Sequence, residues 1–567
     1  MKKEWKYNKL IEDDKVNEIA SKYKISSLLA KILVSRNIID DEKIKIFLDP
    51  KRDDFYDPFL MPDMENAVDR ICKAIEKNEK ITIYGDYDVD GITSTTVLES
   101  FLKERGANVT HYIPNRLNEG YGLNNDALKK ISEDGTKLVV TVDCGITAIS
   151  EVEYAKSLGL DLVITDHHEP GDEIPFTIAV VDAKRKDNIY PFREFAGVGV
   201  AFKVAQAISI KLELDEKEYL KYLDIVAIGT IADVVPLVDE NRTITKLGLK
   251  LLKVTKNIGL KELINITGYK NIDSTMVAFG IAPRINACGR MGKEKEALNL
   301  FLTKDLKKAG QLAENLNNYN QKRQEIEKEI FEEAKKKAEE DNDKSVLVLE
   351  GDNWHHGVIG IVSSKITELY FKPSILIGFD GEDGKGSGRS VPGFDIHDAI
   401  VKCSSYLEKS GGHEMAVGLS LKKENFEKFK EEFEKYACNT NLCDIIPIIN
   451  IDEEAKLNEL NVDVIKELSL LEPYGEANRM PIFMIKNLKI NSIRSLSEGK
   501  HIKMVLQDNH YFIDAIGFNL GYLANEYKIG DRVDVVGSLE VNEFNRKQIN
   551  ANKFKRYKKS IKRRAFI

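Results

Sequence analysis

Four short runs rich in Val and Ile, spread between about residues 80 and 240, constrain the fold of this chain more than any other feature. They are ITIY (81–84), LVVTV (138–142), LVIT (162–165) and IAVV (178–181). Longer amphipathic stretches separate the runs, and this alternation is typical of repeated βαβ units around a parallel sheet. Each run is followed at once by polar residues or glycine, and in three clear cases the run leads to an Asp. Open parallel sheets place their sites at the carboxyl ends of the strands, so we expect these aspartates at one edge of the sheet.

The first run leads into a segment in which aspartates alternate. The segment is YGDYDVDGITS, and its carboxylates belong to Asp86, Asp88 and Asp90. Like charges this close repel one another, and divalent cations make such a cluster tolerable. A capping or turn role accounts for one aspartate but not for three. The segment therefore predicts a site for Mg²⁺ or Mn²⁺, which prefer hard oxygen ligands.

Two further strand ends supply similar ligands. Asp143 follows LVVTV, and Asp166, His167 and His168 follow LVIT. An isolated pair of histidines would favour a structural role, but here the topology places them beside the aspartates. Neutral imidazole mixed with carboxylate suits Mn²⁺ and other borderline divalent ions better than Ca²⁺, which indicates a catalytic ion.

A further acid lies in the apolar stretch DIVAIGTIADVVPL. This acid is Asp233, and the stretch around it is expected to be buried. An unpaired buried carboxylate is costly, and a metal partner removes that cost. Asp224, nine residues earlier in the chain, is interpreted as a helix or structural acid and not as a ligand.

The remainder of the chain divides into further modules, because 567 residues exceed what one hydrophobic core can organise. After Asp305 a polar stretch carries apolar residues at helical spacings, which predicts a long connecting helix. A second α/β block begins at SVLVLEGDNWHHG and contains the glycine-rich segments GKGSGRSVPG and SGGHEMAVG, where we expect the backbone to approach a ligand. From about residue 446, short strands such as HIKMVLQD, YFIDAIGF, RVDVVGSLEV and KQINANKF fit a small oligonucleotide-binding barrel.

Composition narrows the class of protein. No apolar run reaches the roughly 18 residues of a membrane span, and the N-terminus lacks the apolar core of a secretory signal, so we expect a cytoplasmic protein. The six cysteines form no C-x-x-C pair, which favours reduced thiols. The net charge is −8, but basic residues are dense in the tail NRKQINANKFKRYKKSIKRRAFI, and local basic patches are what bind phosphates.

Taken together, these segments resemble the DHH phosphoesterase superfamily. The resemblance is carried by Asp166-His167-His168, by DYDVD and VDCG upstream, and by GTIAD downstream. Within the superfamily the chain resembles the RecJ family of bacterial single-strand-specific exonucleases, from about residue 45 to the basic tail. That closer resemblance rests on the segments IPNRLNEGYGL, AGVGVAFKVA, GIAPRINACGRMG, WHHGVIGIVSSKI, GSGRSVPGFDIHDA, GGHEMAVG and LLEPYGEANRMPIF.

The resemblance implies an α/β fold in which a DHH-type parallel-sheet domain is joined by a long helix to a DHHA1 α/β domain, followed by an OB-like β-barrel. The expected division is 1–50 N-terminal helical segment, 51–304 DHH catalytic domain, 305–343 connecting helix, 344–440 DHHA1 domain, 446–557 nucleic-acid-binding barrel and 558–567 basic tail. The resemblance also implies that this fold hydrolyses single-stranded DNA from its 5′ end, in DNA recombination and repair.

The same resemblance implies a site with two divalent ions, Mn²⁺ or Mg²⁺. The matching metal positions are Asp88, Asp90, Asp143, His167, His168 and Asp233, and the catalytic ones among them are Asp88, Asp143 and His168. Asp86 matches an acid in the same loop. Many members of the superfamily carry a His four residues before the first ligand Asp, where this chain has Tyr84.

A second set of residues is expected to bind the 5′ end of the strand. It comprises Arg116, Arg284, Asn286, Arg290, Ser387, Arg389 and His413. Arginine suits phosphate because its planar fork donates two parallel hydrogen bonds. Each arginine alone would more readily be a surface salt bridge, but their glycine-flanked settings favour ligand binding. His355 and His356 are left unassigned, and Trp354 is either packing or a base-stacking platform.

Two other functions compete with this hypothesis. A DHH phosphodiesterase acting on short oligonucleotides, cyclic dinucleotides or pyrophosphate shares the metal core, but it needs neither the β-rich C-terminal third nor the basic tail. A binding protein that has lost catalysis would have no reason to keep so many carboxylates together. By resemblance, the expected partners are single-stranded DNA, a helicase and single-strand-binding protein, with no membrane, and the default oligomeric state is a monomer.

Overall fold

The structure is a computed structural model that describes residues 4–7, 13–116, 118–341, 343–440, 442, 446–541, 561–562 and 565–566. The chain forms two compact units. The terminal unit comprises Met1–Phe55, Pro236–Lys246 and Ile448–Ile567, and the central unit comprises Tyr56–Val235 and Leu247–Pro447.

A five-stranded parallel sheet organises the first half of the central unit. Its strand order is β3-β2-β4-β5-β6, and every neighbouring pair is parallel. The strands are β2 (Ile81–Tyr84), β3 (Val109–Tyr112), β4 (Leu138–Val142), β5 (Asp161–Thr165) and β6 (Ala179–Val181). The four runs predicted from the sequence are β2, β4, β5 and β6, which confirms the parallel α/β class. Edge strand β3 was not predicted.

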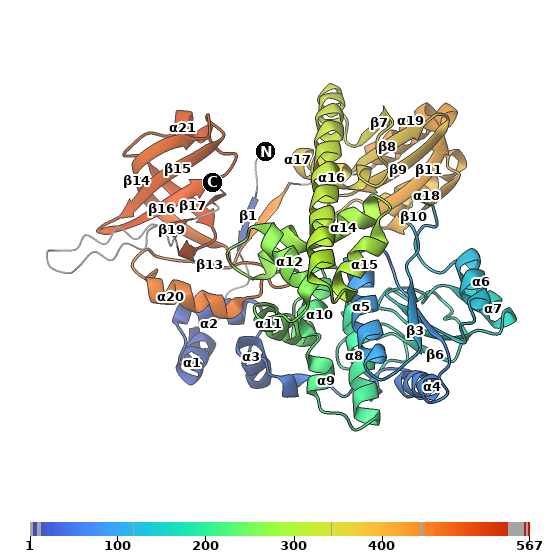
Figure 1. Cartoon of the computed structure of the whole chain (residues 1–567). Helices are drawn as coiled ribbons and strands as arrows, with labels where there is room; N and C mark the ends of the chain where they lie inside the picture. The colour runs from blue at the N-terminus through green and yellow to red at the C-terminus, as the bar shows by residue number, and fades with distance from the viewer. Residues whose placement is uncertain are drawn as a thin grey trace. The chain divides into compact units, whose positions relative to one another are not determined.

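Helices cover both faces of this sheet (Figure 1). They are α4 (Met64–Glu76), α5 (Val89–Lys103), α6 (Asn125–Glu133), α7 (Ile149–Ser157) and α8 (Gly197–Lys211). Helix α9 (Lys217–Leu220) packs against α8, and α10 (Leu223–Ala232) packs against α5 and α8. Helix α5 starts at Asp88, whose side chain accepts a hydrogen bond from the backbone N–H of Gly91 at 3.1 Å. This is an N-cap, and it sets the direction of the aspartate-rich loop that precedes the helix.

The long connecting helix is present as α16 (Leu306–Glu340), and it begins at the N-cap Asp305 as the sequence predicts. Its buried residues include Leu312, Leu316 and Ile330, which belong to the predicted apolar stripe. A group of shorter helices packs beside α16 in the central unit (Figure 1). These and the neighbouring helices are α12 (Ile258–Thr267), α13 (Ser274–Met276), α14 (Ala282–Arg290) and α15 (Glu294–Leu302). Helix α11 (Asp239–Leu252) begins in the terminal unit and ends in the central unit.

A second, mixed sheet forms the rest of the central unit, in the order β10-β11-β9-β8-β7. Its strands are β7 (Leu347–Asp352), β8 (Ser374–Asp380), β9 (Asp383–Arg389), β10 (Lys409–His413) and β11 (Ala416–Lys422), and its helices are α17 (Ile359–Tyr370), α18 (Ile396–Lys402) and α19 (Phe426–Cys438). The prediction that its glycines admit a ligand is wrong for Gly386 and Gly388. A Cβ at Gly386 would lie 2.7 Å from the side chain of Leu419, and a Cβ at Gly388 would lie 2.7 Å from that of Val417. These glycines therefore make room for core side chains.

The terminal unit contains a β-barrel-like sheet in the order β16-β15-β14-β17-β20, with β13 beside β14. Its elements are β13 (Glu453–Glu454), β14 (Phe483–Leu496), β15 (His501–Asp508), β16 (Tyr511–Gly517), β17 (Arg532–Gly537), β18 (Glu540–Val541), β19 (Ile561–Lys562), β20 (Ala565–Phe566), α20 (Val462–Glu467) and α21 (Leu523–Glu526). The predicted strand KQINANKF and most of the basic tail lie outside the described residues.

The N-terminal segment belongs to this same unit. It contributes α1 (Asp13–Tyr23), α2 (Ser27–Ser35), α3 (Asp41–Leu48) and β1 (Glu4–Tyr7), and β1 pairs in parallel with β12 (Ile448–Ile451). Leu29 and Ile32 of α2 share one buried core with Leu488 and Leu506 of the barrel. The two ends of the chain therefore fold together, which sequence periodicity did not indicate.

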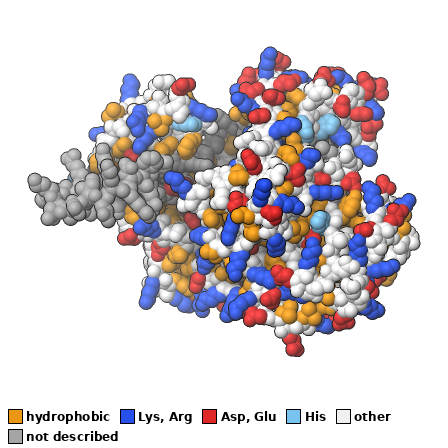
Figure 2. Space-filling view, in the orientation of Figure 1, with side chains coloured by type: hydrophobic (Ala, Val, Ile, Leu, Met, Phe, Trp, Pro, Cys, Tyr) orange, Lys and Arg blue, Asp and Glu red, His pale blue; other side chains and the backbone are white. Residues whose placement is uncertain are grey.

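Within the part of the chain that the structure describes, no helix is long and apolar enough to cross a bilayer. Five of the six cysteines are described, and all five are free thiols: Cys72, Cys144, Cys288, Cys403 and Cys438. Acidic and basic side chains are interspersed over the face seen in Figure 2. No single sign of charge dominates this face, so a binding site for an anion or a cation would be a local cluster of side chains.

Candidate metal centre and strand-binding residues

The predicted ligands come together at the carboxyl edge of the parallel sheet. Strands β2, β4 and β5 are neighbours, so the loops that follow them meet. Three overlapping groups have ligand atoms within 4.8 Å of one another, and each group could hold a cation. They are Asp86, Asp88 and Asp143; Asp90, His167 and Asp233; and Asp143, Asp166, His167 and His168.

Asp90 is fixed by the start of helix α8. Its two carboxylate oxygens accept hydrogen bonds from the backbone N–H groups of Gly197 and Val198, at 2.5 and 2.8 Å. A helix N-terminus favours negative charge, so this contact stabilises the buried carboxylate in the first turn of α5. Gly197 is required here, because a Cβ at that position would lie 2.6 Å from the side chain of Asp143.

His167 lies at the junction of the groups. Its Nε2 is 3.0 Å from Oδ1 of Asp143 and 3.7 Å from a carboxylate oxygen of both Asp90 and Asp233. Its buried Nδ1 has no hydrogen-bond partner. Burial, followed by the charge of the neighbouring His168, lowers the pKa of His167 to about 3, so the ring is neutral at pH 7 and offers a lone pair.

The burial and crowding of the carboxylates indicate that a cation fits among them. Burial, followed by repulsion from Asp88, raises the pKa of Asp90 to about 7, and burial together with Asp90 and Asp88 raises the pKa of Asp233 to about 9. The pKa values of Asp86 and Asp143 are raised as well, first by burial and then by neighbouring aspartates. Oδ1 of Asp86 is buried without a partner. A donor set of this kind is suited to divalent cations, which would offset the repulsion.

The carboxylate of Asp166 is occupied by hydrogen bonds that orient the loop after β5, so it is not a free ligand of the acidic cluster. Its Oδ1 lies 2.7 Å from Nδ1 of His168 and 2.7 Å from the backbone N of His167, and its Oδ2 accepts from the N–H of Ile146 at 2.9 Å. Burial alone lowers the pKa of His168, but the hydrogen bond and charge of Asp166 outweigh it and raise that pKa to about 9. Asp166 therefore fixes the orientation of the His168 ring.

Tyr121 is a site residue that the sequence analysis did not single out. Its hydroxyl donates to the backbone oxygen of Asp143 at 3.2 Å and lies 3.1 Å from Nδ1 of His168. The available signal was the segment EGYGL, which carries part of the family resemblance. Tyr121 thus holds two of the predicted strand-end residues in position.

Replacing Tyr121 with Phe is expected to lower turnover about 3- to 10-fold, because one or two hydrogen bonds contribute roughly 1 kcal/mol to the position of His168. The Michaelis constant should change little, since the hydroxyl makes its contacts within the protein. Steady-state kinetics on a labelled single strand measures both constants. Tyr154→Phe on helix α7 is the matched control, and a Tyr121→Phe variant with full turnover would contradict this role.

Asp224 is the structural acid that the sequence predicts, whereas two other acids and one tyrosine differ from simple expectation. Asp233 is not fully buried as predicted: its side chain is 23% exposed because helix α10 ends there. Asp224 accepts from the hydroxyl of Thr255 at 2.5 Å, a structural contact. Asp182, at the end of β6, is buried and was missed; burial raises its pKa to about 8. Tyr84 donates its hydroxyl to the backbone oxygen of Gly122 at 2.9 Å, away from a ligand role.

Several of the expected strand-binding residues form an arginine cluster. Burial, followed by the nearby charges of Arg116, Arg323 and Arg389, lowers the pKa of Arg290 to about 10. Arg389 donates to Oγ of Ser387 at 3.1 Å. Arg116 also lies close enough to Asp86 to lower the pKa of that carboxyl against the effect of burial. The cluster therefore adjoins the acidic centre and is suited to an anion.

The other expected strand-binding residues are placed differently. Asn286 lines a cavity of about 780 Å³ together with Arg290. Arg284 donates instead to the backbone oxygen of Gly280 at 2.6 Å and to Oδ1 of Asn317 at 3.1 Å. His413 is exposed, and its Nδ1 accepts from the N–H of Met415 at 3.4 Å, which closes a turn.

The two histidines left unassigned, His355 and His356, make hydrogen bonds to the protein backbone. Nδ1 of His355 accepts from the N–H of Gly357 at 3.1 Å, and Nε2 of His356 lies 3.1 Å from the oxygen of Gly378. Trp354 is 3% exposed and donates its indole N–H to Glu333 at 2.9 Å. Of the two roles considered for Trp354, the structure supports packing.

Comparison with known proteins agrees with this architecture. Sequence models of the DHH family N-terminal domain, the DHHA1 domain and the RecJ OB domain match residues 80–230, 343–439 and 451–552. The single-stranded-DNA-specific exonuclease RecJ of Bacillus subtilis is 40% identical over 544 residues, which is 95% of this chain and 68% of that protein.

Solved structures give the same result. The crystal structure of Thermus thermophilus RecJ in complex with Mn²⁺ matches with a TM-score of 0.84 and 30% identity over 96% of this chain and 77% of that one. The Mg²⁺ complex from the same organism matches with a TM-score of 0.78 and 28% identity over 99% and 77% of the two chains. On its sequence and its fold, this chain belongs to the RecJ family of single-stranded-DNA-specific exonucleases.

Proposed function

We propose that this chain is a metal-dependent exonuclease that removes nucleotides from the 5′ end of single-stranded DNA. The observation that carries the proposal is the acidic and imidazole cluster beside the arginine cluster of Arg116, Arg290 and Arg389. One cluster suits divalent cations and the other suits a phosphate. The names of the relatives at up to 40% identity supply the substrate.

The residues proposed to hold two divalent cations, Mn²⁺ or Mg²⁺, are Asp88, Asp90, Asp143, His167, His168 and Asp233. When bound, such ions activate water and neutralise charge that develops on a scissile phosphate. The protein's own contribution is to fix the ligands: helix α8 holds Asp90, and Asp166 holds His168. The side chain of His168 is 45% exposed, so it is also the imidazole that a phosphate oxygen can reach.

The strand end is proposed to bind through Arg116, Asn286, Arg290, Ser387 and Arg389, with Arg284 and His413 in supporting positions. A 5′ phosphate accepted by these donors would set the polarity of digestion. A narrow cleft between the two α/β parts of the central unit would admit one strand and exclude duplex. A duplex without any helicase, digested as fast as a single strand, would contradict this part of the proposal.

The cellular setting follows from the family. We expect a cytoplasmic monomer that acts in recombination and repair, together with a helicase that unwinds duplex and with single-strand-binding protein. The barrel of the terminal unit is expected to hold the single strand.

Digestion of a 5′-phosphorylated single-stranded oligonucleotide labelled at its 3′ end, with Mn²⁺, tests the function. We expect a ladder of labelled products that shortens from the 5′ end, because the arginine cluster binds that end. A matched duplex and the same strand with a 5′ hydroxyl are the controls and should be digested more slowly. Turnover of dinucleotides or pyrophosphate without a ladder would instead establish the small-substrate phosphodiesterase.

A further inference from the structure

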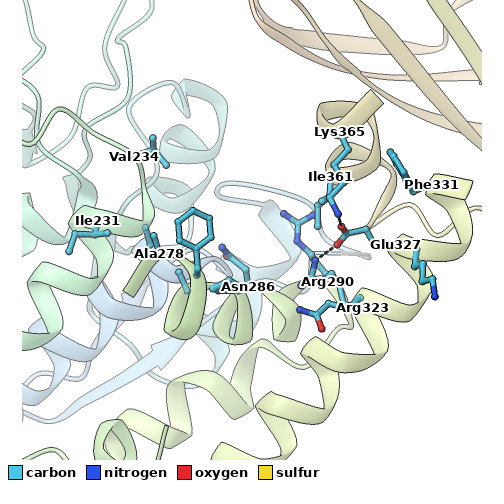
Figure 3. Close-up of a pocket in the computed structure, with 16 residues that line it drawn as sticks. Ile231, Val234, Ala278, Asn286, Arg290, Arg323, Glu327, Phe331, Ile361 and Lys365 are labelled. Carbon is cyan, nitrogen blue, oxygen red and sulfur yellow. Dashed lines mark hydrogen bonds and ion pairs between the residues drawn. The ribbon is translucent and has the colours of Figure 1, made fainter. Parts of the chain in front are cut away.

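The cavity of about 780 Å³ in the central unit extends from the neighbourhood of Asp233 to helix α16. Ile231 and Val234, which flank Asp233 in sequence, lie at one end of it, and Arg323, Glu327 and Lys365 lie at the other (Figure 3). Its volume is in the range that holds sizeable ligands, about 300–1,000 Å³. The cavity is therefore large enough to take part of a strand that passes the metal centre.

The charges that line the cavity are unequal. Four cations, Arg290, Arg323, Lys328 and Lys365, face one carboxylate, Glu327. Glu327 is 4% exposed, and it forms ion pairs with Arg323 through Oε2 and with Lys365 through Oε1. A single buried carboxylate thus holds two of the four cations.

The position of Glu327 is one that a phosphate would suit. Arg323 and Glu327 are one helical turn apart on α16, and the second amino group of Arg323 donates to Oδ1 of Asn320 at 2.7 Å, which holds the fork in place. Arg323 therefore binds Glu327 through one amino group, and a phosphate oxygen can accept the same charge-assisted hydrogen bond as a carboxylate oxygen. The side chain of Lys365 is 51% exposed, so it can follow an entering anion.

Aromatic side chains indicate which anion enters. Phe279 lines the cavity and is 70% exposed, and it belongs to the π-helical turn Val277–Ile281. Phe331 lines the cavity at the end where Glu327 and Lys365 lie (Figure 3), with Nζ of Lys365 5.9 Å from its ring centroid. Aromatic rings beside cations are typical of sites for single-stranded nucleic acid, where bases stack while phosphates pair with Lys and Arg. A free inorganic anion would make no use of these rings.

We propose that Glu327 occupies a backbone-phosphate subsite and that an entering single strand exchanges one of its phosphates for this carboxylate on Arg323 and Lys365. The inference rests on the proposed exonuclease function and adds a regulating residue to it. Each phosphate must displace Glu327 to bind, and Glu327 returns when the strand moves on. The carboxylate thereby keeps the subsite from holding the strand too tightly for it to advance.

Binding of an oligothymidylate of about 20 nucleotides to the full chain in EDTA, over a range of salt concentrations, tests the exchange without hydrolysis. Glu327→Gln should bind about 5-fold or more tightly at low salt, with a slope of log K against log salt that is steeper by about 0.7 per cation released. Lys365→Gln should bind more weakly with a shallower slope. Glu329→Gln, an exposed position on the same helix, should match the wild type.

The outcomes separate this proposal from the function on which it rests. Equal or weaker binding by Glu327→Gln, with the variant folded by circular dichroism, would make Glu327 a purely structural partner of Arg323. If Glu327→Gln does not fold, the exposed Lys365 still decides, because an unchanged salt slope for Lys365→Gln contradicts the subsite. Failure of the wild-type chain to bind the strand at all would instead contradict the proposed function.

Discussion

The Asp143→Asn variant is expected to digest single strands at least about 10³-fold more slowly than the wild type, a loss of roughly 4 kcal/mol in transition-state stabilisation. Asp143 belongs to two of the three groups that could hold a cation, and its Oδ1 lies 3.0 Å from Nε2 of His167. Its side chain packs directly on Gly197, where a Cβ would lie only 2.6 Å away, so Asn at position 143 is held in the same place without the charge. Initial rates with Mn²⁺ on a 3′-labelled strand measure the loss.

A second readout distinguishes loss of metal binding from misfolding. In EDTA the melting temperature of Asp143→Asn should equal or exceed that of the wild type, because one of several mutually repelling buried carboxylates has been neutralised. Added Mn²⁺ should raise the wild-type melting temperature and leave that of the variant nearly unchanged. Asp224→Asn, a buried acid of the same half of the unit paired with Thr255, is the control for folding. An Asp143→Asn variant that still gains stability from Mn²⁺ would remove this residue from the ligand set.

Local signals explain why the acidic centre could be predicted from sequence. The strands β2, β4 and β5 are short apolar runs, and each is followed directly by its acids. Because all three strands are parallel neighbours, their order alone brings Asp88, Asp143 and His167 to one edge. Run length and the position of each strand end predicted the acidic edge, and the family resemblance selected the metal positions within it. The long helix α16 was predictable for the same reason.

Features that depend on contacts distant in sequence were not predictable. Tyr121 reaches His168 across 47 residues, and no spacing rule connects the two. Gly386 and Gly388 suggested a ligand, yet their role is to admit Leu419 and Val417 from the neighbouring strand β11. A sequence shows where the glycines are, but it does not show which neighbouring side chain occupies the space that a Cβ would need. The arginines also needed the fold: Arg284, Arg290 and Arg389 each donate to a backbone oxygen, but Arg290 and Arg389 lie near Arg116 as well.

Sequence patterns did not show that the N-terminal helices and the C-terminal barrel fold into one unit. The segment Pro236–Lys246 also belongs to the terminal unit, although it lies far from both ends in sequence. Arg242 explains how this segment is held. Its guanidinium donates to four backbone oxygens, those of Phe47 at 2.7 Å, Leu470 at 2.9 Å, Leu471 at 3.0 Å and Glu472 at 3.1 Å. The guanidinium carbon also lies 3.6 Å from the ring centroid of Phe47.

Arg242→Met is therefore expected to lower the free energy of unfolding of the terminal unit by about 4 kcal/mol. Arg242 is 1% exposed, and each buried oxygen left without a donor costs roughly 1–3 kcal/mol, with less than full additivity among neighbours. Burial lowers the pKa of Arg242 to about 9, so the side chain is still charged at pH 7. Arg242→Lys should recover part of the loss, since one ammonium group keeps the charge but cannot span four oxygens.

The two tryptophans of the chain allow this loss to be assigned to one unit. Trp5 lies in the terminal unit and Trp354 in the central unit. In a Trp354→Phe background, urea unfolding followed by the fluorescence of Trp5 should show an earlier transition for Arg242→Met. In a Trp5→Phe background, the transition reported by Trp354 should stay in place. Arg479→Met, which removes an exposed arginine paired with Glu476 in the same unit, should change stability by less than about 0.5 kcal/mol. If Arg242→Met shifted both transitions equally, the segment Pro236–Lys246 would have to stabilise the central unit as much as the terminal one.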